Sequence, residues 1–167
     1  MARVLGIDPG TAITGFGLVQ DLPDGSLTSI AYGTLRTPTG LPDHQRLAML
    51  YEQLQQVIQL HHPAACAVEK LFFQRNVSTA IAVGQARGVV LLAIAQAGLE
   101  VYEYTPNEVK RAAAGYGSAG KRQVQEMVRV LLGLPDIPRP DDAADALAVA
   151  ICHLNTRRYS EPGSGRE

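Results

Sequence analysis

Short apolar runs rich in β-branched residues occupy the first quarter of the chain, over residues 3–8, 14–20 and 27–36. Each run has the length of a strand, and the turn-forming residues 23–25 separate the second run from the third. Because the links between the runs are short, we expect these three strands to form an antiparallel meander.

From residue 41 onward, apolar residues at helical spacing alternate with two more short apolar runs. Helices are expected over residues 41–60, 76–97, 106–114, 118–132 and 141–157, and strands over residues 64–68 and 99–104. The expected helix caps are Asn76 or Ser78, Thr105 with Glu108, Ser118, and Asp141 or Asp142. This order favours an α/β fold, a five-stranded mixed sheet with three antiparallel strands and then two parallel ones, flanked by helices on both faces.

The chain of 167 residues has 46% hydrophobic and 19% charged residues, which is ordinary for one globular domain. We expect the domain to span residues 1–157 and the tail, residues 158–167, to be disordered. The most apolar stretch, residues 89–98, is interrupted by Gln96, so no membrane span is expected. The chain starts directly with a strand pattern, so no signal peptide is expected either. Cys66 and Cys152 lie in apolar segments and are interpreted as buried free thiols, which favours a cytoplasmic protein.

The expected helix over residues 76–97 is rich in small residues and includes Gly84 and Gly88. Glycine inside a helix costs about 1 kcal/mol relative to alanine, so its use there needs a compensating contact. The pattern predicts close approach by another helix, either of the same domain or of a second copy of the chain.

Charge is unevenly distributed although the net charge is only −1. Residues 70–135 carry eight Lys and Arg against four Asp and Glu. This middle segment is a candidate surface for nucleic-acid phosphates, although an ordinary solvated face would show the same imbalance.

Four carboxylates stand where apolar segments end or begin. Asp8 and Glu69 follow apolar runs directly, and Asp142 and Asp145 open the last apolar helix. Neighbouring carboxylates that leave water repel one another, and they need a cation between them. Because Mg²⁺ prefers oxygen ligands, the pattern predicts a metal-dependent phosphoryl-transfer site.

Asp141 complicates this assignment, because either Asp141 or Asp142 could simply cap the last helix. Capping does not explain Asp145, whose neighbours are alanine and leucine. Asp142 and Asp145 are three residues apart and therefore share one face of the helix.

Two glycine-containing loops suggest phosphate chemistry. Residues 5–11 resemble both the first phosphate loop of actin-like ATPases and the first strand of ribonuclease H-like nucleases. Residues 115–121 begin like a P-loop, but they follow a helix and are succeeded by Arg122, which lacks the required hydroxyl. Lys121 and Arg122 are better interpreted as phosphate contacts at a helix N-terminus.

Phe72 and Phe73 follow Glu69 closely. Composition favours a place in the core for both, because most phenylalanine is buried. The alternative is an exposed aromatic that stacks on an unpaired base.

Taken together and in order, these segments resemble the RuvC family of Holliday-junction resolvases over residues 3–153. The matching segments are L-G-I-D-P-G at 5–10, T-G-F-G at 14–17, Glu69 with Phe72, G-Q-A-R-G-V at 84–89, V-K at 109–110, G-S-A at 117–119 and D-A-A-D-A-L-A at 142–148.

The resemblance implies a ribonuclease H-like fold and a homodimer that nicks four-way junction DNA in recombination and repair. It implies that Asp8, Glu69, Asp142 and Asp145 form the catalytic set, and it favours Asp142 over Asp141. It also implies two Mg²⁺ ions per active site, for which Mn²⁺ can substitute.

The resemblance further implies that Phe72 stacks in the opened junction, a role that Phe73 could share. It gives Lys110 and Lys121 as DNA contacts, to which the charge pattern adds Arg75 and Arg122. It places Gly84 and Gly88 at the dimer interface, and it implies RuvA and RuvB as partners.

Three alternatives remain open on the sequence. The nearest is another ribonuclease H-like nuclease that acts on RNA or linear DNA. An actin-like ATPase would need two such domains and a second phosphate loop. A non-catalytic junction-binding module would need the basic surface but not four acids.

Overall fold

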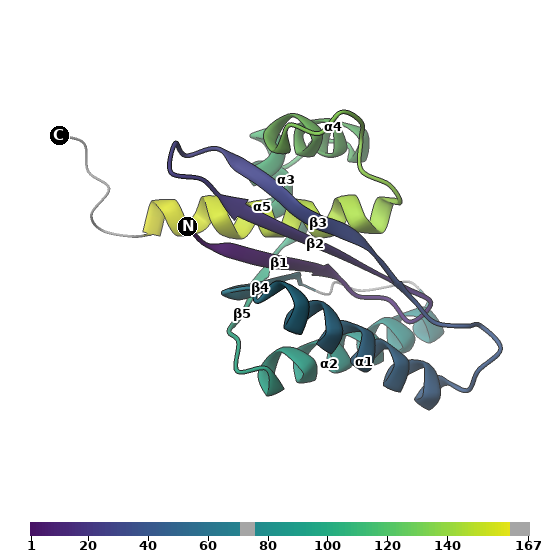
Figure 1. Cartoon of the computed structure of the whole chain (residues 1–167). Helices are drawn as coiled ribbons and strands as arrows, with labels where there is room; N and C mark the ends of the chain where they lie inside the picture. Colours follow the sequence, from purple (N-terminus) through teal and green to yellow (C-terminus); the bar gives the residue numbers. More distant parts are fainter. Residues whose placement is uncertain (71–75, 161–167) are drawn as a thin grey trace.

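The computed structural model describes residues 1–70 and 76–160 of the chain, and of residues 159–160 only the backbone. The elements follow in the order β1 (Arg3–Asp8), β2 (Ile13–Asp21), β3 (Leu27–Arg36), α1 (Asp43–His61), β4 (Ala65–Glu69), α2 (Val77–Gln96), β5 (Val101–Tyr104), α3 (Pro106–Ala114), α4 (Lys121–Leu132) and α5 (Asp141–Ser160). Figure 1 shows these elements along the chain.

The strands form one five-stranded mixed sheet in the order β3-β2-β1-β4-β5. β1, β2 and β3 pair antiparallel, whereas β4 pairs parallel to β1 and β5 pairs parallel to β4. The expected sheet of three antiparallel strands followed by two parallel strands is therefore confirmed. Because β1 and β4 run parallel, their carboxyl ends meet at one edge of the sheet.

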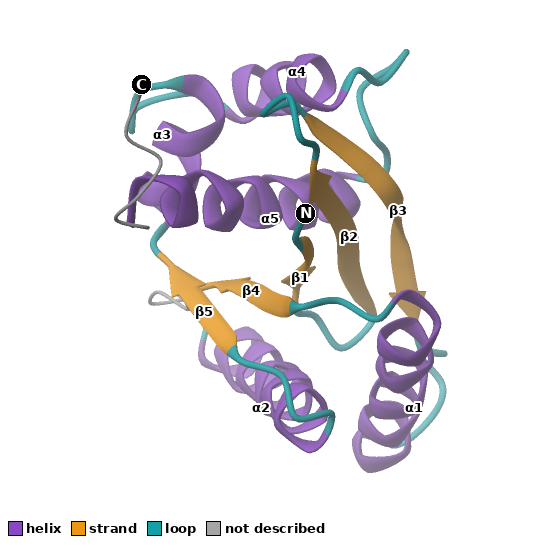
Figure 2. Ribbon diagram, turned by 60° about the vertical axis from the view of Figure 1, so that its left-hand side comes forward, coloured by secondary structure: helices purple, strands orange, loops and turns teal. Residues whose placement is uncertain are grey.

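Helices cover both faces of the sheet, as predicted (Figure 2). α1 and α2 lie on one face, and α5, backed by α3 and α4, lies on the other. Successive side chains of a strand point to opposite faces of the sheet, so each strand contributes to two hydrophobic cores, one on each face. Leu5 and Ile7 of β1 pack in the core beneath α1 and α2, whereas Val4 packs in the core around α5.

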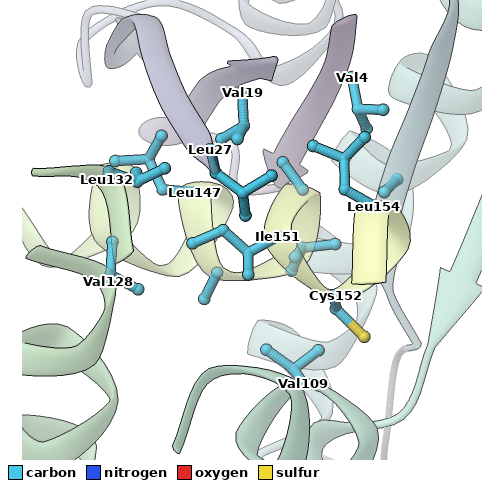
Figure 3. Packing of buried hydrophobic residues seen from close by; sticks show 14 of the residues in the cluster. Val4, Val19, Leu27, Val109, Val128, Leu132, Leu147, Ile151, Cys152 and Leu154 are labelled. Atoms are coloured by element: carbon cyan, nitrogen blue, oxygen red, sulfur yellow. The ribbon is translucent and has the colours of Figure 1, made fainter. Parts of the chain in front are cut away.

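The core around α5 brings side chains from three strands onto one helix. In Figure 3, Val4, Val19 and Leu27 lie on the sheet side of α5, close to Leu147 and Leu154. The helix is also covered on its opposite side by α3 and α4, so most of its middle is fully buried. This burial explains why the helix is apolar on every face except at its ends.

α5 lies unusually close to the sheet because glycines stand beneath it. A Cβ atom on Gly6 would lie 1.9 Å from the Ala146 carbonyl oxygen, and a Cβ atom on Gly15 would lie 2.0 Å from that of Asp142. Both distances are far below van der Waals contact, so only glycine permits this approach. The approach sets the depth at which the first turn of α5 sits over the strand ends.

Several predicted helix ends are confirmed and two are wrong. The Asn76 side chain caps α2, and Thr105 with Glu108 forms the expected capping box of α3. Ser118 does not cap α4, whose N-cap is Gly120, and the Gly120 N–H donates to the Gln123 side chain at 3.0 Å instead. α5 continues to Ser160, beyond the predicted end at residue 157, and residues 161–167 of the predicted tail lie outside the described residues.

α2 differs from expectation in one respect. The sequence predicts no membrane span, yet α2 is long and apolar enough to cross a membrane, by length and composition alone, among the described residues. The same composition suits a helix that packs on a sheet, and Ala86, Val90 and Ala93 are indeed buried there. Both cysteines are free and buried, as predicted.

The other face of α2 has no cover from the described part of the chain. No atom lies within 4 Å of a Cβ position built on Gly84 or Gly88. Val77, Ile81 and Leu92 on the same helix are 72%, 58% and 51% exposed. At Gly84 and Gly88, close approach by a helix from the described residues is thus excluded, which leaves the second copy as the open alternative.

Candidate active site

The fold brings the four predicted carboxylates together at one edge of the sheet. Asp8 ends β1 and Glu69 ends β4, and these parallel strands pair up to Ile7 with Val68, one residue before each acid. Asp142 and Asp145 come from the first turns of α5, which lies over the same edge.

Gly15 is the structural reason why Asp142 reaches Asp8. Gly15 is the partner of Asp8 in the β1–β2 register, and its missing Cβ makes room for the Asp142 backbone. The Asp142 side chain thereby lies close enough to Asp8 to raise the pKa of the Asp8 carboxyl group. Thr14, fully buried beside Gly15, donates its hydroxyl to the Gly10 carbonyl at 2.6 Å and shapes the loop after Asp8.

Three of the four carboxyl groups, those of Asp8, Glu69 and Asp145, resist ionisation. Burial, followed by the charges of Asp145 and Asp142, raises the pKa of Asp8 to about 8. Burial also raises the pKa of Glu69 and of Asp145, and the charge of Asp145 adds to the effect on Glu69. Buried carboxylates that repel one another in this way are suited to receive cations.

Two lysines reach the same site. The Lys121 Nζ lies 3.5 Å from Asp145 Oδ2 and 3.4 Å from Asp141 Oδ2. Lys110 and Lys121 line a pocket of about 370 Å³ together with Glu69 and Asp145. The sequence predicted both lysines as DNA contacts, and the structure places them beside the acids.

The other predicted contacts are not gathered in this way. Arg122 is exposed at the start of α4 and does not line the pocket. Phe72, Phe73 and Arg75 lie outside the described residues, so their roles stay predictions.

The donor set fits a hard divalent cation, because all four groups are carboxylates and carboxylate oxygens are the ligands that Mg²⁺ prefers. Within residues 1–70 and 76–160, however, no three His, Cys, Asp or Glu side chains are placed closely enough to hold an ion alone. Mg²⁺ sites of this class are usually completed by water and phosphate oxygens, and such ligands would be needed here.

Arg87 is a residue that the sequence reasoning did not assign. Its guanidinium donates from Nη1 to the Glu69 carbonyl at 2.7 Å and pairs through Nη2 with Glu103. Arg87 lies in one of the segments that resemble the family, but 18 residues separate it from Glu69, and no local sequence signal joins the two.

Known proteins resemble this chain over the segment that contains all four carboxylates. Residues 4–153 match the family described as "Crossover junction endodeoxyribonuclease RuvC". The chain is 60% identical over 151 residues to the protein of that name from Roseiflexus sp. (strain RS-1), covering 90% of this chain and 89% of the relative. It is 59% identical over 154 residues to the one from Chloroflexus aggregans, covering 92% and 93%.

A solved structure agrees with the fold. "T. thermophilus RuvC in complex with Holliday junction substrate" superposes with a TM-score of 0.90 at 38% identity, covering 95% of this chain and 96% of that one. The predicted ribonuclease H-like fold is thereby confirmed. The chain belongs to the RuvC family of crossover junction endodeoxyribonucleases.

Proposed function

We propose that this protein is a structure-selective endodeoxyribonuclease that resolves four-way Holliday junctions by paired symmetric nicks. The observation that carries the proposal is the cluster of Asp8, Glu69, Asp142 and Asp145 at one sheet edge, with Lys121 beside it. The likeness to a RuvC structure in complex with a Holliday junction substrate supports the choice of DNA substrate.

The four carboxylates would hold two Mg²⁺ per active site, and Mn²⁺ could replace them. Bound ions of this kind supply an activated water and neutralise the charge that develops on the leaving oxygen. Water would attack the phosphorus atom and the P–O3′ bond would break, which leaves a 5′-phosphate on one strand end and a 3′-hydroxyl on the other. No covalent enzyme intermediate is required, because water is the nucleophile.

The lysines give the site its affinity for phosphate. Lys110 and Lys121 line the pocket next to Glu69 and Asp145, where a scissile phosphodiester would lie. When phosphate enters, Lys121 can exchange its carboxylate partners for phosphate oxygens, because its pairs with Asp141 and Asp145 are long and more than half exposed on the lysine side. Arg122 and Arg75 would hold neighbouring phosphates, and Phe72 or Phe73 would stack on an unpaired base.

Paired nicks need two active sites in a symmetric arrangement. The uncovered face of α2, with Gly84 and Gly88 at its centre, supplies a surface on which two copies could pack closely. A two-fold dimer matches the near two-fold symmetry of a junction, so each copy would cut one of two like-polarity strands. RuvA and RuvB are the proposed partners in DNA recombination and repair, in the cytoplasm.

Asp8→Asn tests the catalytic assignment. We expect junction binding to persist while the cutting rate in Mg²⁺ falls by at least about 100-fold, the upper end of losses for residues that only support metal ligands. Gel-shift titration in Ca²⁺ and single-turnover cleavage in Mg²⁺ measure the two properties.

Asp141→Asn is the matched control, because the exposed Asp141 side chain pairs with Lys121 and Gln125 at the surface. Its cutting should stay within about fivefold of the wild type, as expected for loss of a surface ion pair. Substantial cutting by Asp8→Asn, or equal losses in both variants, would refute the assignment.

The choice of substrate is tested by comparing a four-way junction, the linear duplex arms and an RNA–DNA hybrid of the same sequence. Paired nicks in the junction with little cutting of the other two support the proposal. Preference for the hybrid or the linear duplex would favour another ribonuclease H-like nuclease, and binding without any cutting would indicate a non-catalytic module.

A further inference from the structure

Arg87 holds the end of the strand that carries Glu69. Its Nη1 donates to the Glu69 carbonyl oxygen at 2.7 Å, and its Nη2 pairs with Glu103 of β5. The arginine side chain is only 13% exposed. One largely buried arginine side chain therefore bridges the ends of β4 and β5 from the face of the sheet that α2 covers.

The end of β4 needs such support. The β1–β4 register stops at Ile7 with Val68, so Glu69 lies one residue beyond the last pair with β1. On the other side, β4 is held by the Glu69–Tyr104 pair and by the Lys70 N–H, which donates to the Tyr104 carbonyl at 2.7 Å. Arg87 adds a charged donor to the Glu69 backbone at the point where the pairing with β1 has ended.

The two halves of Glu69 thus face different partners. Its carboxylate lines the pocket shared with Lys121 and Asp145, next to α5. Its carbonyl is bound from α2. Rotation of the peptide at Glu69 would move the carboxylate, so a bond that fixes the carbonyl also fixes the direction of the acid.

α2 also carries the uncovered face of the protein. Arg87 immediately precedes Gly88 and lies about one turn beyond Gly84, and both glycines have open space around their Cβ positions. A second copy of the chain that packs on this face would therefore contact the helix whose Arg87 binds Glu69. Arg87 is thus placed between the proposed dimer surface and the proposed active site.

We infer that Arg87 is a positioning residue, which orients the Glu69 carboxylate by binding the Glu69 backbone carbonyl. Because Arg87 belongs to α2, the orientation of this carboxylate depends on where α2 packs. The inference rests on the proposed junction-cutting function. It predicts that Arg87 affects cutting without contacting DNA or the reacting atoms.

The test compares Arg87→Met and Arg87→Lys with Arg3→Met. Arg3 is a close match, because its Nη1 also donates to a backbone carbonyl at 2.7 Å, that of His61, and it bonds the Gln20 side chain at the opposite end of β1. The measurements are single-turnover junction cutting against Mg²⁺ concentration, junction affinity in Ca²⁺, oligomeric mass, melting temperature, and amide hydrogen exchange of metal-free protein.

For Arg87→Met we expect cutting to fall by about 10- to 100-fold, as is typical when a group that orients a metal ligand is lost. Half-maximal cutting should need more Mg²⁺, while junction affinity and oligomeric mass stay at wild-type values. In the metal-free protein, the Lys70 amide should exchange faster than in the wild type, and the Leu18 amide in the sheet centre should not. Arg87→Lys, which keeps one charged donor, should recover part of the rate.

Wild-type cutting in Arg87→Met with unchanged exchange at Lys70 would overturn the inference. So would an equal loss of cutting in Arg3→Met, because that would indicate general destabilisation. A wild-type protein that cuts no junction would instead overturn the proposed function, so the two failures are distinguishable.

Discussion

At the scale of single residues, Asp8 shows how the fold prepares a site for cations. Burial opposes the ionisation of its carboxyl group, and the nearby charges of Asp145, Asp142 and Glu69 oppose it further. The pKa of about 8 is the physical consequence. A group of this kind stabilises the metal-free fold only while it is protonated.

The pH dependence of stability follows from that pKa. An unfolded aspartate loses its proton near pH 4, whereas folded Asp8 keeps its proton up to about pH 8. The folded state thus binds more protons between these values, so the free energy of unfolding decreases as pH rises from about 4 to 8. Calorimetry in EDTA should show the melting temperature falling over this window.

Asp8→Asn supplies the control for this prediction, because an amide does not titrate. The variant should lose most of the slope and melt above the wild type at pH 8, by at least about 2–4 °C if one pKa unit, about 1.4 kcal/mol, is relieved. Saturating Mg²⁺ should raise the wild-type melting temperature most at high pH, since the metal binds ionised carboxylates. A slope that is the same in both proteins would contradict the assignment to Asp8.

At the scale of elements, the position of α5 on the sheet decides whether the four acids meet. Glycines of β1 and β2 leave the space that lets the α5 backbone pack close to the sheet. The atom nearest to the Cβ position of Gly15 is the carbonyl oxygen of Asp142. The same contact that packs the helix therefore also places one of the acids.

Gly15→Ala tests this coupling. The added methyl group would lie 2.0 Å from the Asp142 oxygen, so α5 must shift, and overpacking of this kind costs about 1–3 kcal/mol. We expect a lower melting temperature together with a loss of cutting that persists at temperatures where the variant is fully folded. Gly40→Ala is the control, because nothing lies within 4 Å of its Cβ position, and it should change neither property.

At the scale of the whole molecule, α2 presents an apolar face that no other element of the described residues covers. It joins Gly84 and Gly88 to exposed Val77, Ile81 and Leu92. Exposed apolar patches of this kind mark interaction sites, and a second copy with two-fold symmetry would meet the same patch.

Gly84→Leu tests the proposed dimer. Because the position is open within one chain, the monomer should fold normally and gain helix propensity of up to about 1 kcal/mol. The bulky side chain should prevent close approach of two helices and weaken the dimer by about tenfold or more, or about 1.4 kcal/mol. Ala48→Leu on the exposed face of α1 is the control and should leave the mass in analytical ultracentrifugation unchanged.

Much of this molecule could be predicted because local rules specify it. Periodicity along the chain determined the order and type of the elements, and short-range chemistry determined caps such as Asn76 and Thr105. Asp8, Glu69 and Asp145 could be picked out because each interrupts an apolar pattern next to an element end, whereas only the family resemblance favoured Asp142 over Asp141. The cap of α4 was mispredicted because Ser118 and Gly120 are both plausible locally.

The sequence by itself determined which segments become strands and helices and which acids need a partner, because these depend on residues close together in the chain. Only the tertiary structure decided that Gly15 admits Asp142 to Asp8, that Lys121 reaches Asp145, and that Arg87 holds Glu69. Those contacts join residues from separate elements, and their geometry depends on how strands pair and how closely helices dock. No local pattern encodes a distance across the sheet, so the assembled site is a property of the fold.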